Sequence, residues 1–288
     1  MACNKVRTEI FPFELSRDYN NSNTFNHVGE KYVMLTLGMD IGSITTKAVV
    51  LDNNNIIGSK IIFTGFNAAK AGEKVTQELL TQLGLSLEKI EKIVATGYGR
   101  KSVAFAHNNI TEITCHAKGA HFLDNSIRSI IDIGGQDSKV IVIDEHGKVK
   151  DFAMNDKCAA GTGRFLEVMA RALEVDLDEF GELSLKANNP AKISSLCTVF
   201  AESEVISLIA KGETRDNIIA GIHQSIASRI IAMASRVGIT SPVMMTGGVA
   251  KNIGVVKAIE KLLDSPVTVS DNAQIIGALG AALLAAEN

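Results

Sequence analysis

A turn of the type that binds phosphate occurs twice in this sequence, and the two copies lie 92 residues apart. Segments 40–52 and 132–144 align without a gap, and each contains Asp-Ile-Gly, a polar turn and an apolar stretch that ends on Asp. Glycine lets the backbone approach an anion closely, and successive N–H groups in such a turn form a concave nest. The pair therefore predicts two hairpins that face each other across a nucleotide.

One Asp-x-Gly turn alone is explained equally well as an ordinary connection between strands. Its recurrence with the same flanking strands, and with a Lys seven residues after each Asp, favours the functional interpretation. Side chains near the first turn supply hydroxyl donors and a cation for a polyphosphate, and two aspartates can hold Mg²⁺ directly or through water. These candidates are Ser43, Thr45, Thr46 and Lys47, with Asp40 and Asp137 for the metal.

The duplicated pattern resembles the superfamily of sugar kinases, actin, Hsp70 and acetate kinase, in which two related domains clamp ATP between two such hairpins. The resemblance implies a duplicated α/β ATPase fold of the actin, Hsp70 and sugar-kinase (ribonuclease H-like) type. In this fold two βββαβ-type domains surround a nucleotide cleft.

Composition limits the possible classes of protein. With 288 residues, of which 46% are hydrophobic, the chain is long enough to fill the cores of two modest domains. No apolar run reaches the roughly 18 residues that span a bilayer, and the first thirty residues lack a signal peptide pattern. A net charge of −3 without a basic run argues against nucleic acid as a partner. We expect a cytoplasmic protein that does not bind a membrane.

The changes of periodicity predict an extension and two subdomains. Residues 1–33 are polar and form the extension, residues 34–128 form subdomain I, and residues 129–272 form subdomain II. A small-residue helix near 273–288 packs back on subdomain I. The predicted strands after the hairpins are 56–63, 90–96 and 149–154, and the predicted helices are 75–83, 163–175, 200–211, 215–237, 252–263 and 274–285.

The strand at 242–246 runs into Gly247-Gly248. Two glycines can simply let a strand turn into a helix. In the superfamily, however, a Gly-Gly turn at this place lies against the adenosine, where a side chain would collide with the base or ribose. Asn252 and Gln274 are then candidate polar contacts to the nucleoside.

Two of the four cysteines stand just ahead of predicted helices. Cys158 lies in a glycine-containing loop and Cys197 follows Ser-Ser-Leu, whereas Cys115 has the pattern of a small buried hydrophobe and Cys3 lies in the extension. A helix N-terminus stabilises a thiolate or an anionic cluster bound to it.

Two thiols do not complete a metal site, since Fe–S and structural Zn sites usually take four ligands. A second copy of the chain, related by a twofold axis, could supply the other two. Spacing alone leaves two independent core cysteines as an open alternative, because 38 intervening residues match no compact metal motif. A disulfide is disfavoured in the cytoplasm.

Four segments together make the resemblance specific. Residues 96–100, 132–137, 155–165 and 197–207 resemble the activator component of 2-hydroxyacyl-CoA dehydratases, the BadF/BadG/BcrA/BcrD ATPase or CoA-enzyme activase family. The resemblance covers the chain from about Met34 onward and leaves the extension unexplained.

Membership of that family would imply an oxygen-sensitive homodimer with one 4Fe-4S cluster between the subunits, held by Cys158 and Cys197 of each chain. A ferredoxin or flavodoxin would supply an electron. ATP binding and hydrolysis would drive the transfer of that electron to a separate dehydratase. The physical logic is a population shift, in which ATP favours one of two conformations.

The resemblance also assigns roles to the two turns and to the loop after Cys158. Asp40, Gln136 and Asp137 are the catalytic candidates, with Gln136 or Asp137 orienting the attacking water. The candidates for binding ATP/ADP and Mg²⁺ are Ser43, Ile44, Thr45, Thr46, Lys47, Gly134 and Gly135, and the candidates for coupling phosphate to the cluster are Gly161, Thr162 and Gly163.

Three other functions remain open from the sequence. One is an activase whose partner acts on a CoA ester other than a 2-hydroxyacyl-CoA. A small-molecule kinase of the same fold would need a substrate pocket and a base, but has no use for the two cysteines. A nucleotide-gated scaffold would hold Zn rather than Fe–S at a Cys₄ dimer site.

Overall fold

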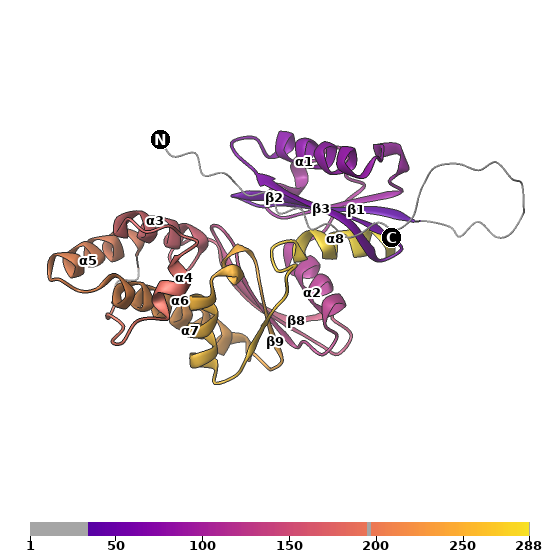
Figure 1. Ribbon diagram of the computed structural model, residues 1–288. Helices are drawn as coiled ribbons and strands as arrows, with labels where there is room; N and C mark the ends of the chain where they lie inside the picture. The colour runs from indigo at the N-terminus through magenta and orange to yellow at the C-terminus, as the bar shows by residue number, and fades with distance from the viewer. Residues whose placement is uncertain (1–33, 195–196, 288) are drawn as a thin grey trace, which may run out of the picture.

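The computed structural model describes residues 34–194 and 197–287, so the predicted extension 1–33 lies outside the described residues. Two five-stranded mixed sheets dominate it (Figure 1), with the orders β3-β2-β1-β4-β5 and β10-β9-β6-β7-β8. The strands of the first sheet are β1 (Leu35–Ile41), β2 (Thr45–Asp52), β3 (Asn55–Phe63), β4 (Lys92–Thr96) and β5 (Asn108–Asn109). Those of the second are β6 (Ser129–Ile133), β7 (Ser138–Ile143), β8 (Val149–Asn155), β9 (Val243–Thr246) and β10 (Val267–Val269).

The two sheets repeat one topology, because β8-β7-β6-β9-β10 has the same pairing directions as β3-β2-β1-β4-β5. The registers match as well. Asp40 pairs with Lys47 across the first hairpin, and Asp132 pairs with Lys139 across the second. The predicted duplicated α/β fold is therefore confirmed.

Alternation along β1 decides which helix covers each face of the first sheet. Leu37, Met39 and Ile41 pack with α1 (Ala68–Leu83) in one apolar core. Gly38 and Asp40 point to the opposite face, where a Cβ on Gly38 would lie 2.1 Å from a carbonyl oxygen of α8 (Ile276–Glu287). The carboxylate of Asp40 thus lies on the same side as α8.

Helices α2 (Glu112–Leu123) and α8 lie between the two sheets (Figure 1). They cross closely, because a Cβ on Gly280 of α8 would lie 1.8 Å from the carbonyl oxygen of Cys115 on α2. Ala117 and Ala120 of α2 pack against Ile130 of the second sheet. The faces of the two hairpins that carry Asp40 and Asp132 therefore look toward these two helices.

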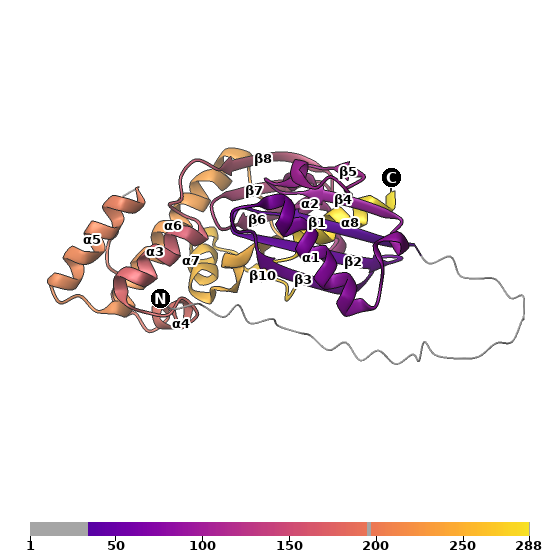
Figure 2. The ribbon, with the colours of Figure 1, turned by 90° about the horizontal axis from the view of Figure 1, so that it is seen from above.

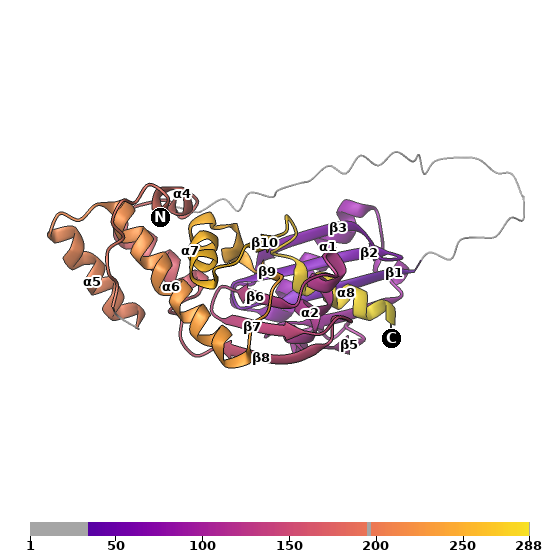
Figure 3. The same cartoon turned by 90° about the horizontal axis from the view of Figure 1, so that it is seen from below.

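The outer face of the second sheet is covered by a large apolar core and by the remaining helices, which extend away from the first sheet (Figures 2 and 3). They are α3 (Gly163–Leu173), α4 (Phe180–Ser184), α5 (Thr198–Ala210), α6 (Arg215–Val237) and α7 (Ile253–Leu263). Helix α5 forms the far end of this group.

Although no uninterrupted apolar run reaches 18 residues, α6 is long and apolar enough to cross a membrane by length and composition alone. In the fold, however, Ile218, Ile222, Ile226 and Ile230 of α6 are fully buried in the core of the second domain. Packing inside the domain accounts for the apolar character of this helix.

Most predicted elements are present, with differences at the ends. Helix α1 begins at Ala68, seven residues before its predicted start, where Asn67 caps it by accepting a hydrogen bond from the Lys70 N–H. Helices α2 and α4 and the short strands β5 and β10 were not predicted. Two- and three-residue strands carry too little periodicity to be found in a sequence.

Candidate functional site

The turns of the two hairpins touch each other. A Cβ on Gly135 in the second turn would lie 2.3 Å from Cγ1 of Ile44 in the first, so only glycine fits there. The turns that sequence reasoning assigned to phosphate are thus brought together by the fold.

The side chains of the first turn divide into two groups. Lys47 forms an ion pair with Asp40 at 3.0 Å, and the hydroxyl of Thr46 is fully buried against Thr64 at 2.9 Å. Ser43 and Thr45 are half-buried. Ser43 lies in the turn and Thr45 begins β2, and their half-buried hydroxyls remain the better candidates for direct phosphate contact.

Lys139 is the centre of a buried charged cluster. Its Nζ lies 2.8 Å from Glu112, 3.0 Å from Asp132 and 2.5 Å from Asp137, and its side chain has no exposed surface. Burial alone would lower the pKa of this ammonium, but the three carboxylates raise it above its ordinary value. Although burial opposes its charge, Lys139 and the hydrogen bond from Thr246 act to hold the pKa of Asp132 below its usual range.

The two candidates for orienting water in the second turn differ in their surroundings. Asp137 is buried and bonded to Lys139, and burial raises its pKa. Gln136 is exposed at the tip of the turn. Of the two, only Gln136 has a side chain that is free to follow a ligand.

Sequence reasoning missed Glu112 and His116 on α2, which complete the cluster. His116 Nδ1 lies 3.1 Å from Thr246 Oγ1, and Thr246 donates to Asp132 Oδ1 at 2.9 Å. Burial and the charge of Asp40 raise the pKa of Glu112. The spacing of four residues that puts both side chains on one face of a helix was the available signal.

Glu112, His116 and Asp132 present ligand atoms within 4.8 Å of one another, as a metal site would. Lys139 Nζ already contacts two of the three. An ammonium in that position takes the place of a cation, so these residues fit a salt-bridge cluster better than a metal ion.

The predicted nucleoside contacts lie after β9. Gly247 has φ +85°, and a Cβ on it would lie 2.3 Å from the Ile133 carbonyl oxygen. Around Gly248, by contrast, a Cβ would meet only Gln274 Nε2, at 3.7 Å. The fold thus requires the first glycine, whereas the second faces open space beside Gln274.

Asn252 is engaged within the fold. Its Oδ1 accepts from the Val255 N–H at 3.1 Å and so caps α7, and its Nδ2 lies 3.4 Å from His223 Nε2. His223 is buried, and burial lowers its pKa to about 3. A contact from Asn252 to a nucleoside would have to share these bonds.

The cysteines occupy different environments. Cys115 is fully buried, as predicted, and burial raises the pKa of its thiol to about 12. Cys158 is half-buried and Cys197 is exposed at the start of α5, and both are free thiols. Helix α5 has no side-chain cap at Cys197, so its first N–H groups are available to a thiolate there.

The loop after Cys158 is hydrogen-bonded directly to the second hairpin. The Gly163 N–H donates to the Gly134 carbonyl at 2.9 Å, and the Arg164 N–H donates to the Gly135 carbonyl at 2.8 Å. Thr162 closes the loop by donating its hydroxyl to the Ala159 carbonyl at 2.6 Å. Four residues therefore separate Cys158 from Gly163, which is bonded to the phosphate-type turn.

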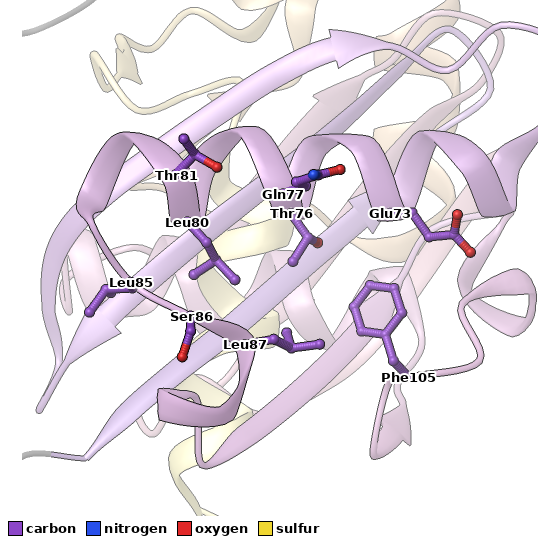
Figure 4. A pocket seen from close by; sticks show the side chains of 9 residues that line it. All are labelled: Glu73, Thr76, Gln77, Leu80, Thr81, Leu85, Ser86, Leu87 and Phe105. Carbon is purple, nitrogen blue, oxygen red and sulfur yellow. The ribbon is translucent and has the colours of Figure 1, made fainter.

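A pocket of about 370 Å³ lies elsewhere, between α1 and the segments around Leu87 and Phe105 (Figure 4). Of its lining residues only Glu73 is charged. It shares no residue with the hairpins or the cysteines and offers no set of groups for catalysis.

Comparisons with known proteins agree with this geometry. Residues 37–285 match the model of the BadF/BadG/BcrA/BcrD ATPase family. The chain is 52% identical over 255 residues to an activator of lactoyl-CoA dehydratase from Anaerotignum propionicum. The aligned residues make up 88% of this chain and 98% of that protein.

Solved structures give the same result. The activator of the 2-hydroxyisocaproyl-CoA dehydratase from Clostridium difficile with bound ADPNP superposes with a TM-score of 0.84 and 46% identity, over 88% of this chain and 95% of that one. A ROK family glucokinase from Streptomyces griseus superposes with a TM-score of 0.56 at 15% identity, over 88% of this chain and all of that one. The second likeness concerns the fold alone and confirms the sugar-kinase type of architecture.

Proposed function

This chain belongs to the BadF/BadG/BcrA/BcrD ATPase family, and from that membership we propose that it hydrolyses ATP to activate a 2-hydroxyacyl-CoA dehydratase by passing it one electron. ATP and Mg²⁺ bind between the two hairpin turns, with Asp40, Ser43 and Thr45 on one side and Gly134 and Gly135 on the other. A ferredoxin or flavodoxin is the electron donor, and the protein works in the cytoplasm without nucleic acid or membrane.

The thiols of Cys158 and Cys197 are proposed to hold the redox centre together with the same two thiols of a second chain. Both are free, and each lies ahead of a helix N-terminus that favours an anionic ligand. A 4Fe-4S cluster bound there supplies one-electron transfer at low potential.

An apolar surface on α5 supports a second chain at this place. Val199, Phe200, Ile206 and Ile209 lie on α5, which begins directly after Cys197, and are between 43% and 68% exposed. Neighbouring exposed apolar side chains of this kind mark interaction sites. A homodimer that shares its cluster would cover them.

The observation that carries the proposal is the pair of backbone bonds from the start of α3 to Gly134 and Gly135. Any shift of the second turn on binding or losing the terminal phosphate moves these carbonyls, and with them the loop that carries Cys158. Nucleotide state is thereby linked to the cysteine through a bonded path rather than through proximity alone.

The test is anaerobic purification followed by iron and sulfide analysis and electron paramagnetic resonance after dithionite reduction. We expect about four irons per dimer, lost in Cys158→Ala and Cys197→Ala. Cys115→Ala is the matched control, because its thiol is buried away from the two loops, and it should keep its iron. No iron in the folded wild-type protein would overturn the proposal.

A further inference from the structure

His116 is a buried side chain to which the proposed function assigns no role. It lies on α2 between the two sheets and is 4% exposed. Its Nδ1 contacts Thr246 Oγ1 at 3.1 Å. The hydroxyl of Thr246 donates its hydrogen to Asp132, whose carboxylate only accepts. The oxygen of Thr246 must therefore accept from His116, so Nδ1 carries a hydrogen.

This chain of bonds fixes the orientation of the imidazole. With the hydrogen on Nδ1, the neutral ring has an unshared electron pair on Nε2. A carboxylate that orients a histidine through its other nitrogen is the arrangement that prepares an acceptor for catalysis. Here Asp132 acts on the ring through the hydroxyl of Thr246.

The free Nε2 faces the first domain. A Cβ on Gly277 of α8 would lie 2.9 Å from Nε2 and 3.3 Å from Asp40 Oδ2, so glycine at this position keeps the space between them open. On its own helix Nε2 lies 3.9 Å from Glu112 Oε1, beyond hydrogen-bond distance. The other oxygen of Asp40, Oδ1, is buried without a hydrogen-bond partner among the described residues.

We infer that His116 positions the water that attacks the terminal phosphate of ATP, by accepting a hydrogen bond from that water at Nε2. The inference rests on the proposed ATPase function and names a residue for it. The water oxygen forms a bond to the γ-phosphorus while the bond from this phosphorus to the bridging oxygen of ADP breaks, and the proton of the water ends on inorganic phosphate.

The location favours this role over a structural one. Asp40 and Asp132 are the next-to-last residues of the strands that lead into the two hairpin turns. His116 lies between the two sheets, on a helix that belongs to neither hairpin. A histidine that only filled the core would not need its Nε2 held as a hydrogen-bond acceptor on the side of Asp40. Gln136 and Asp137, the residues expected from the sequence, are respectively exposed and bonded to Lys139.

Two substitutions separate the two nitrogens of the ring. His116→Asn keeps a donor near Nδ1 for Thr246 but lacks an acceptor at Nε2. His116→Gln places an amide near Nε2 but gives up the bond to Thr246. On the same helix, His121 Nε2 lies 3.2 Å from the Glu145 carbonyl oxygen at the surface, and His121→Asn is the matched control.

The experiment measures the kcat of ATP hydrolysis, the Kd for ADPNP and the Tm of each variant. We expect His116→Asn to lose kcat by about tenfold to a hundredfold with Kd and Tm close to wild type. His116→Gln should have a lower Tm but a higher kcat than the Asn variant. His121→Asn should match wild type in all three.

The outcomes separate this inference from the proposed function. A wild-type protein that hydrolyses no ATP contradicts the proposed function itself. Hydrolysis at the wild-type rate by His116→Asn overturns the inference alone. So does a common fall of kcat and Tm in both variants, because a structural role would produce it. If the Asn variant does not fold, a kcat of His116→Gln more than about a hundredfold below wild type overturns the inference, because the amide near Nε2 should keep part of the acceptor function.

Discussion

Thr96 and Thr246 end equivalent strands of the two sheets but bond to different partners. Thr246 donates to Asp132 at 2.9 Å, whereas Thr96 donates to the Ile110 carbonyl at 2.9 Å, although the register opposite each aspartate is the same. Asp40 is left with a buried oxygen that has no hydrogen-bond partner in the described part of the chain. The duplicated scaffold therefore has one saturated aspartate and one that keeps an open acceptor.

Removing the two threonine hydroxyls should have unequal effects. Thr246→Val takes a hydrogen bond from a buried carboxylate and from His116, which should cost about 2–4 kcal/mol of unfolding free energy. Thr96→Val removes a bond to a neutral carbonyl and should cost about 1 kcal/mol. Urea unfolding monitored by circular dichroism measures both, and equal losses would contradict the asymmetry.

The two repeated lysines make a second matched pair. Lys139→Met leaves three buried carboxylates without their cation and should destabilise the fold by about 3–5 kcal/mol. Lys47 has one carboxylate partner and a side chain that is 14% exposed, so Lys47→Met should cost less than half as much. Denaturant midpoints of the two variants at one pH test the order, and a larger loss for Lys47→Met would show that the Lys139 cluster contributes little.

Repetition made the hairpins and their aspartates predictable, because the same alternating pattern occurs twice with the same polar turn. It could not predict α2, since this helix is covered from both sides and shows little amphipathic contrast. The role of His116 could not be predicted either. Its role depends on Thr246, which is 130 residues away in the sequence and meets it only through the packing of α2 between the sheets.

The same limit applies to the residues near the cysteines and the nucleoside. The sequence identified Cys158, Thr162 and Asn252 by motif, but not the hydrogen bonds that engage them. Asn155 Nδ2 donates to the Cys158 carbonyl at 2.9 Å, a contact that a local turn sets. The bond from Gly163 at the start of α3 to Gly134 joins residues 29 positions apart, a distance that no local pattern encodes.

His223 should make the fold sensitive to acid. Burial lowers the pKa of His223 to about 3, against about 6.5 in the unfolded chain. Between these two pH values the unfolded state therefore binds a proton that the folded state does not bind. Stability is full above pH 6.5 and falls as the pH drops toward 3. Between pH 7.5 and 5.5 this histidine should cost about 1.4 kcal/mol.

The check is urea unfolding of wild type and His223→Gln at these two pH values. The variant should lose about 1.4 kcal/mol less than wild type over the same interval, whatever its stability at pH 7.5. His146→Gln serves as control, because its side chain is 83% exposed, and it should follow wild type. An equal pH dependence in all three proteins would show that His223 is not buried in its neutral form.

Gly247 and Gly248 allow the nucleoside site to be tested without a change in the fold. A methyl group on Gly248 meets only Gln274 Nε2, at 3.7 Å, so Gly248→Ala should keep the wild-type Tm. If the adenosine lies against this turn, the same methyl should weaken ADP binding at least tenfold. Gly247→Ala differs, because φ +85° and a 2.3 Å approach to the Ile133 carbonyl make it destabilising by itself. Calorimetric titration of ADP measures binding, and thermal unfolding measures stability. Wild-type affinity in Gly248→Ala would place the nucleoside elsewhere. Weaker binding at unchanged Tm would locate it beside Gly248.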